Sequence, residues 1–206
     1  MRSSRRIRRM TGTAVLSAAA TVLMYLEFSV PLMPPFVKMD FSELPALLAG
    51  FAYGPLSGIL VCLIKNLFKV AATQSFGVGE LFNFTMGALF VGTAALCYRL
   101  RRTRLTALIG SAAGAALMAA ASVPFNYFVV YPAYARFFPM EQIIGMYRAI
   151  RPSADGLLSC LLIFNLPFTF LKGAADAALT FGIYKPLSGI LHGRRNTITE
   201  ANQSHD

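Results

Sequence analysis

Polar side chains recur at helical spacing within an otherwise apolar segment near the end of the chain. Asn165, Thr169, Lys172 and Asp176 follow one another at intervals of four, three and four residues, which places them on one face of a helix. Such a stripe can line a pocket for a polar solute, with Lys172 at its floor. Alternatively, Lys172 and Asp176 can form a structural ion pair with each other. Pro167 lies one turn into the segment and is expected to bend it.

Other apolar segments also carry polar residues near one end. These residues are Asp40, Glu43, Lys65, Asn66, Lys69, Glu80, Asn83, Asn126 and Tyr127. An ionisable side chain inside a membrane costs a few kcal/mol, so such residues usually line a protein interior or a cavity. We therefore expect these segments to surround a common polar space.

The chemistry available in these segments does not point to an enzyme. Both histidines, His192 and His205, lie in the C-terminal tail, and the sequence contains neither a GxSxG motif nor cysteines at metal-ligand spacing. The stretch QSFGVGE (74–80) has two glycines that let the backbone approach a ligand closely. No Walker lysine follows it, and an ordinary turn explains it equally well. We predict no catalysis, no metal and no cofactor.

The overall composition is that of a membrane protein. Of the 206 residues, 56% are hydrophobic and only 14% are charged, against roughly 25% charged in soluble domains. The net charge of +10 comes from clusters next to apolar segments, at residues 2–9, 99–104 and 194–195. Such clusters mark cytoplasmic loops and contact anionic lipid headgroups. We therefore expect a lipid bilayer, and no nucleic acid, as the partner of these charges.

The apolar segments predict six membrane crossings. Five apolar blocks cover residues 10–30, 41–70, 81–98, 105–130 and 156–187. The second is too long for one crossing of a hydrocarbon core about 30 Å thick, and Gly54-Pro55 divides it into helices at 42–53 and 55–71. The predicted fold is an all-α, six-helix membrane bundle over residues 10–190, with a basic cytoplasmic tail (1–9) and a disordered cytoplasmic tail (191–206).

This topology places the polar residues on one side of the membrane. The outward loops would be 31–40, 72–80 and 131–155, and MEQIIGMYRAI (140–150) in the last loop is expected to form a short surface helix. All the polar residues named above then lie toward the outer face, whereas no comparable set lies at the cytoplasmic ends.

Small residues four apart predict close helix packing in two segments. Ala14 and Ala18 occupy such positions in the first segment, and Gly110 and Gly114 do so in the fifth. Internal packing is the expected use of the glycine pair. The alanine pair suits either internal packing or a partner protein.

Several stretches resemble one family of membrane proteins. EFSVPLMPPFVKMDFSELPALLAGFAYGPLSGILVCLIKN (27–66), GVGELFNFTMG (77–87), FNYFVVYP (125–132) and PFTFLKG (167–173) are similar to the riboflavin-specific substrate-binding subunits of energy-coupling factor transporters. The resemblance covers about residues 10–185. It implies a six-helix bundle with riboflavin bound near the outer face, beneath the loop between the first two helices. It also implies that an AxxxA pattern, here Ala14 and Ala18, docks on a transmembrane coupling subunit that binds two cytoplasmic ATPases.

The resemblance assigns roles to particular residues. Asn126 stands where the family has a ligand-facing asparagine, and Lys172 stands where it has a lysine. Thr169 replaces a family asparagine, and Asn165 lies one turn earlier where it can compensate. The predicted substrate-binding residues are Phe36, Asp40, Glu43, Gly77, Val78, Gly79, Asn83, Asn126, Tyr127, Asn165, Thr169 and Lys172.

These residue types suit a flavin. Riboflavin has a flat ring system, a uracil-like edge and a hydroxylated chain, so it needs apolar walls and a few fixed polar groups. Asparagine side chains carry both a donor and an acceptor for the uracil-like edge. Candidates for the walls are Phe28, Phe36, Phe41, Tyr127 and Phe168. We expect residues 31–43 to form a lid in which Lys38 and Asp40 remain in headgroup water or face the ligand.

The resulting hypothesis is a riboflavin-binding subunit of a vitamin importer in the cell membrane, with its pocket toward the outside. The alternative is a self-sufficient carrier for another small aromatic vitamin or solute. Carriers of that kind often contain an inverted repeat, and no internal repeat is evident in this sequence.

Overall fold

The computed structural model describes residues 2–73, 75–137, 139–154 and 156–192, and this part of the chain is mainly helical. The longer helices are α1 (Arg2–Tyr25), α2 (Glu43–Tyr53), α3 (Pro55–Val70), α4 (Val78–Leu100), α5 (Arg104–Phe125), α7 (Met140–Ile150) and α9 (Leu166–His192). The shorter elements are strands β1 (Phe28–Ser29) and β2 (Lys38–Met39), helices α6 (Tyr131–Tyr134) and α8 (Leu157–Cys160), and the π-helical turns η1 (Asn126–Val130) and η2 (Leu161–Asn165).

Each predicted apolar segment contains a helix in the described part of the chain. The predicted break at Gly54-Pro55 is confirmed, because Gly54 has a φ of 102° and Pro55 begins α3, as the two residue types favour. Three helical stretches within the described residues are long and apolar enough to cross a membrane: Val78–Leu100, Arg104–Tyr134 and Leu157–Ile183. The surface helix predicted at 140–150 is α7.

The two predicted tails differ from the structure in the part that is described. The basic residues at the N-terminus form the first turns of α1, which begins at Arg2 rather than after a separate tail. At the other end, α9 runs to His192. The rest of the predicted C-terminal tail lies outside the described residues.

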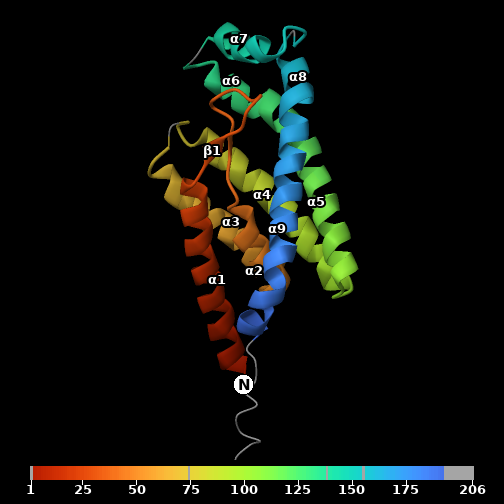
Figure 1. The fold of residues 1–206 in the computed structure, drawn as a ribbon. Coiled ribbons are helices and arrows are strands. Elements are labelled where there is room, and N and C mark those ends of the chain that lie inside the picture. The colour runs from red at the N-terminus through yellow and green to blue at the C-terminus, as the bar shows by residue number, and fades with distance from the viewer. Residues whose placement is uncertain (1, 74, 138, 155, 193–206) are drawn as a thin grey trace, which may run out of the picture.

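The helices form an elongated bundle whose two ends have different chemistry. The arginine-rich start of α1, the turn between α4 and α5, and the end of α9 lie at one end (Figure 1). The strands, the turn between α3 and α4, and helices α6, α7 and α8 lie at the other end, with α7 lying across it (Figure 1). The grouping predicted from charge and polarity is therefore present in the fold.

The segment between α1 and α2 forms a small hairpin, which is called the lid hairpin below (residues 28–39). Phe28 pairs with Met39 and Ser29 pairs with Lys38 in an antiparallel ladder. The intervening stretch contains Pro31, Pro34 and Pro35, which cannot donate backbone hydrogen bonds. The prolines therefore confine the ladder to two residues on each side, and the predicted irregular lid is present between the strands.

Each π-helical turn ends two residues before a proline, which explains its position. Pro132 clashes with the carbonyl four residues earlier, at Phe128 within η1, and Pro167 does the same to Ile163 within η2. A π-turn accommodates such a clash by widening the helix, and it rotates the residues that follow. The bend predicted at Pro167 is therefore seen as a change of helical register that ends at Asn165.

The predicted glycine pair brings α5 against α4. A methyl group at Gly114 would lie 2.6 Å from the carbonyl oxygen of Phe90, and one at Gly110 would lie 2.9 Å from the carbonyl oxygen of Ala94. Because these neighbours are backbone atoms, they cannot move without separating the helices. The internal use of the pair is therefore confirmed.

We expect Gly114→Ala to destabilise the protein in detergent by about 1–3 kcal/mol, since the added methyl forces α5 away from α4. The measurement is the thermal unfolding midpoint. Gly145→Ala in α7 is the matched control, because no atom lies within 4 Å of a methyl group at that position. Equal unfolding midpoints for the two variants would contradict close packing at Gly114.

Candidate binding site

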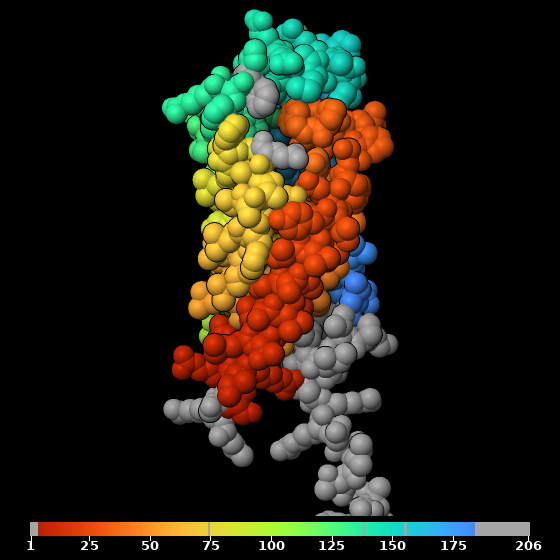
Figure 2. Space-filling model, turned by 90° about the vertical axis from the view of Figure 1, so that its left-hand side faces the viewer, coloured from red at the N-terminus to blue at the C-terminus, as the bar shows by residue number. Residues whose placement is uncertain are grey.

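A cavity of about 290 Å³ lies at the end of the bundle that carries the lid hairpin. Its walls come from α1, the lid hairpin, and helices α2, α3, α4, α5, α6 and α9, together with η1 and η2. In the space-filling view, a hollow is visible between the orange lid hairpin and the yellow start of α4, with blue atoms behind it (Figure 2). The volume is close to the lower limit for small-molecule pockets, which is about 300 Å³.

Most of the predicted binding residues line this cavity. They are Phe36, Asp40, Glu43, Gly79, Asn83, Asn126, Asn165, Thr169 and Lys172. These residues come from segments far apart in the sequence, and the predicted common polar space is therefore present in the structure.

Gly77, Val78 and Tyr127 are not among the residues that line the cavity. Gly77 has a φ of 84° and shapes the turn before α4, while Val78 packs in a cluster with Tyr131 and Tyr147. Tyr127 is 40% exposed and its ring lies edge-on to Phe128. It therefore does not form the predicted wall.

The aromatic walls differ from the prediction in other ways too. Phe36 and Phe168 line the cavity, whereas Phe28 and Phe41 do not and instead contact each other, with ring centroids 5.9 Å apart. The unpredicted aromatic residues of the wall are Phe82, Tyr131 and Tyr134. Tyr131 and Tyr134 follow η1, whose π-turn shifts the helical register after Asn126.

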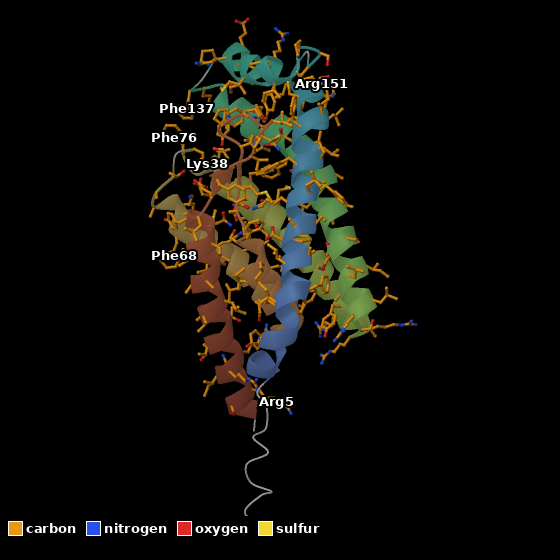
Figure 3. The ribbon with its side chains drawn as sticks, viewed as in Figure 1. Arg5, Lys38, Phe68, Phe76, Phe137 and Arg151 are labelled. Atoms are coloured by element: carbon orange, nitrogen blue, oxygen red, sulfur yellow. The ribbon has the colours of Figure 1, made fainter. Side chains whose placement is uncertain are left out.

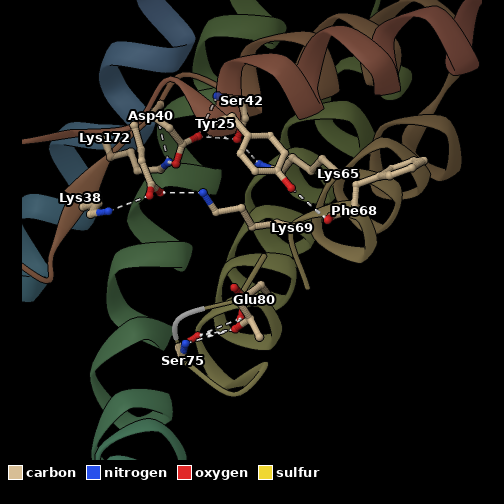
Figure 4. Close-up of polar contacts among 12 residues, drawn as sticks. Tyr25, Lys38, Asp40, Ser42, Lys65, Phe68, Lys69, Ser75, Glu80 and Lys172 are labelled. Carbon is tan, nitrogen blue, oxygen red and sulfur yellow. Dashed lines mark hydrogen bonds and ion pairs between the residues drawn. The ribbon is translucent and has the colours of Figure 1, made fainter. Parts of the chain in front are cut away.

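Four charged residues form a cluster in and behind the cavity wall. Lys172 pairs with Asp40 at 2.8 Å and with Glu43 at 3.1 Å, and Lys65 pairs with Glu43 at 2.6 Å. Ser42 links the same groups, since its hydroxyl donates to Asp40 and accepts from Lys65. Figure 4 shows Asp40 and Lys172 facing each other. These contacts connect the end of the lid hairpin to α2, α3 and α9.

The cluster decides between two pairs of alternatives. Asp40 was expected to remain in headgroup water or face the ligand, and the structure places it in the cavity lining, only 5% exposed and paired with Lys172. Burial alone raises the pKa of Asp40, yet the adjacent charges of Lys172 and Lys65 outweigh burial and hold that pKa below its usual value. The alternative Lys172–Asp176 pair is not what the structure contains, because Lys172 is paired with Asp40 and Glu43.

A second ion cluster lies at the rim. Glu27 accepts from Lys38 of the lid hairpin at 2.8 Å and pairs with Lys69 of α3 at 3.2 Å. All three residues line the cavity, and Lys69 also lies over the ring of Tyr25 (Figure 4). Glu27 was not predicted as a site residue, because it lies at the end of an apolar segment with no charged neighbour in sequence.

The turn before α4 is ordered by a carboxylate. Glu80 accepts hydrogen bonds from the hydroxyls of Thr73 and Ser75, at 2.9 and 2.8 Å. Ser75 and Glu80 line the cavity. At its outer edge, Phe76 stacks on Phe137 with ring centroids 4.1 Å apart, and both side chains lie on the outside of the molecule (Figure 3). This stack joins the turn to the segment after α6.

Two of the asparagines that line the cavity, Asn126 and Asn165, are each held by a hydrogen bond. Asn126 donates through Nδ2 to the carbonyl oxygen of Ser122 at 2.9 Å. Asn165 accepts at Oδ1 from the hydroxyl of Tyr147 at 2.8 Å. Both asparagines are buried, at 4% and 9% exposure. They therefore offer fixed polar atoms to whatever occupies the cavity.

The fold and the site define a helical protein with membrane-spanning segments and a polar cavity suited to a small solute. Comparisons with known proteins identify the family. The family model "ECF transporter, substrate-specific component" matches residues 8–184. The chain belongs to this family, whose members here are named as transporters and not as enzymes.

The relatives cover nearly the whole chain. The chain is 32% identical to "Riboflavin transporter RibU" of Staphylococcus aureus over 184 residues, which are 89% of this chain and 92% of that protein. It is 33% identical to "Riboflavin transporter FmnP" of Bacillus subtilis over 82% of this chain and 85% of that protein. A solved S component of a bacterial ECF transporter superposes with a TM-score of 0.73, at 31% identity, covering 92% of this chain and 99% of that one.

We expect Lys65→Met to destabilise the protein by about 3–5 kcal/mol, because it leaves the buried Glu43 carboxylate without its nearest cation. The measurement is thermal unfolding in detergent without ligand. The double variant Glu43→Leu/Lys65→Met removes both charges and should recover most of the loss. A double variant less stable than Lys65→Met would show that the pair is not the source of the effect.

Proposed function

We propose that this protein is the riboflavin-binding subunit of an ECF-type importer and that it captures the vitamin from the outer side of the cell membrane. Riboflavin is then the transported ligand and not a cofactor. The observation that carries the proposal is a cavity with buried asparagines and aromatic walls in a chain whose relatives are named riboflavin transporters.

The chemistry of the cavity supports a flavin. Phe36, Phe82 and Phe168 provide apolar surface for a flat ring system, and Asn126 and Asn165 provide amides for its uracil-like edge. Thr169 and Asn83 are among the lining residues that can meet the hydroxyls of the ribityl chain. Thr169 replaces a family asparagine, and Asn165 lies one turn away on the same wall.

The arrangement of charge supports an outward cavity and six crossings with both termini in the cytoplasm. The arginines of α1 and of the turn at 99–104 lie at the end of the bundle opposite the lid hairpin (Figure 1). Arginine clusters next to membrane helices favour the cytoplasm, so the lid hairpin would face the outside. Helix α1 and the shorter helices α2 and α3 would supply the three further crossings.

The proposed partners are a transmembrane coupling subunit and two cytoplasmic ATPases. Ala14 and Ala18 lie on an exposed face of α1 together with Val15 and Val22, which are 63% and 60% exposed. Small side chains on such a face let another helix approach closely. This surface is the proposed contact with the coupling subunit, whose ATPases would drive delivery of riboflavin.

We expect the purified protein to bind riboflavin, which is detected by quenching of flavin fluorescence. Asn126→Ala should weaken binding about 10-fold or more, since it removes a fixed hydrogen-bonding group from the cavity. Ser111→Ala is the control on the same helix: Ser111 does not line the cavity, and its hydroxyl has no hydrogen-bond partner among the described residues. A folded protein that neither retains nor rebinds riboflavin would overturn the proposal.

Ala14→Trp/Ala18→Trp should leave riboflavin affinity unchanged and abolish riboflavin uptake by cells that express the complete transporter. Bulky side chains would hold the partner helix away from α1, and neither alanine lines the cavity. Radiolabelled uptake and co-purification of the ATPases measure the two effects. Leu108→Trp, at an exposed position of α5, is the control for a bulky residue on a lipid-exposed face. Normal uptake by the double variant would exclude this face as the contact.

A further inference from the structure

A tyrosine outside the cavity contacts three residues that line it. Tyr147 of α7 is fully buried and is not itself a lining residue. Its hydroxyl bonds to Asn165 at 2.8 Å and to Tyr131 at 2.7 Å, and its ring lies edge-on to Phe36 of the lid hairpin at 5.8 Å between centroids. Tyr147 is thus a common support for the lid hairpin, α6 and the segment before α9.

The hydrogen bonds of Tyr147 have a defined direction. A phenol carries one hydrogen, and in Tyr147 this hydrogen is donated to Oδ1 of Asn165. Tyr131 must then donate the hydrogen that joins the two hydroxyls. Burial raises the pKa of Tyr147, so its hydroxyl keeps the proton that it donates to Asn165. The two hydrogen bonds therefore run in one direction, from Tyr131 to Tyr147 and from Tyr147 to Asn165.

This direction determines which atom of Asn165 is left for a ligand. Because the Tyr147 hydroxyl holds Oδ1 in place, the amide of Asn165 is fixed in one orientation, and its Nδ2 group is directed away from Tyr147 as a donor. Asn126 is held in the opposite sense, since its Nδ2 donates to the carbonyl oxygen of Ser122 and its Oδ1, which has no hydrogen-bond partner among the described residues, remains as an acceptor. The two amides are thus fixed in opposite orientations, with a donor at Asn165 and an acceptor at Asn126.

We propose that Tyr147 is a positioning residue that fixes the Asn165 amide as a donor, so that the cavity selects ligands with a carbonyl next to an N–H group. The inference rests on the proposed function, in which the ligand is a flavin. The uracil-like edge of a flavin carries N3–H between the carbonyls at C2 and C4. The N–H matches the acceptor of Asn126, and one of the carbonyls matches the donor of Asn165.

The packing of α7 explains how Tyr147 is held in place. Ile143 and Tyr147 are four residues apart, so they lie on one face of α7, and both are buried against a cluster that includes Phe164 and Leu161. The Phe164 ring lies 5.2 Å from the Tyr147 ring. The tyrosine therefore cannot turn away from Asn165 without unpacking the outer end of the bundle.

The test compares riboflavin with its 2-thio and 4-thio analogues, in which a weaker acceptor replaces one carbonyl oxygen. Four proteins are titrated: the unsubstituted protein, Tyr147→Phe, Asn165→Ala and the double variant. The unsubstituted protein should bind one of the analogues about 10-fold more weakly than riboflavin. This ratio should fall below about 3-fold in Tyr147→Phe, and the double variant should bind riboflavin no more weakly than Asn165→Ala alone.

A purely structural role of Tyr147 gives a different result. Tyr147→Phe would then lower the unfolding midpoint but preserve the thio discrimination, and its effect on affinity would add to that of Asn165→Ala; this outcome overturns the proposal. Tyr98→Phe is the control for loss of a tyrosine hydroxyl, since Tyr98 packs on Phe51 and is not a lining residue.

The unsubstituted protein provides an independent measurement in case Tyr147→Phe does not fold. Equal affinity for riboflavin and both thio analogues would overturn the fixed donor at Asn165, while riboflavin binding itself would leave the proposed function intact. Absence of any flavin binding would overturn the proposed function and this inference with it.

Discussion

The ion pair between Lys172 and Asp40 is the interaction on which the outer half of the structure depends. It joins α9 to the end of the lid hairpin at 2.8 Å, and both side chains are largely shielded from solvent. An unpaired charge in that environment is costly, whereas a paired one is tolerated. The pair therefore holds the lid hairpin in one position over the cavity, because opening it would leave at least one charge without its partner.

The need to pair buried charges also applies deeper in the bundle, because Glu43 is shared by two lysines. Glu43 contacts both Lys172 and Lys65, so the cluster continues from the lid hairpin to α3. Further down α9, both carboxylate oxygens of Asp176 lack a hydrogen-bond partner among the described residues. The ion pairs among Glu43, Lys65 and Lys172 fix the relative positions of α2, α3 and α9.

Two prolines affect the part of the site that contains the uncharged residues Asn126 and Asn165. Pro132 and Pro167 force π-helical turns, and each turn carries one cavity asparagine, Asn126 or Asn165. A regular helix would direct the following side chains differently, because a π-turn inserts one residue into the register. Asn165 ends η2, so the shift in that turn affects its direction, whereas Asn126 begins η1 and the shift there affects the residues after it. The glycine contacts between α4 and α5 keep the rest of the bundle tightly packed.

The sequence by itself determined the helical segments, the division of the bundle into a basic end and a polar end, and many of the polar residues of the cavity wall. These properties depend on composition, local spacing and residues such as Gly54 and Pro55, whose effects are local. Only the tertiary structure decided which side chains pair with one another. Lys172 is 132 residues from Asp40 and four from Asp176, and local spacing favours the second pair, although the fold forms the first. In the same way, the sequence indicated only that Tyr147 lies in a surface helix and did not indicate its hydrogen bond to Asn165. The sequence also predicted Tyr127 as a wall residue, whereas Tyr131 and Tyr134 line the cavity instead. Long-range contacts and shifts in helical register arise from the packing of segments distant in sequence, and no local pattern records them.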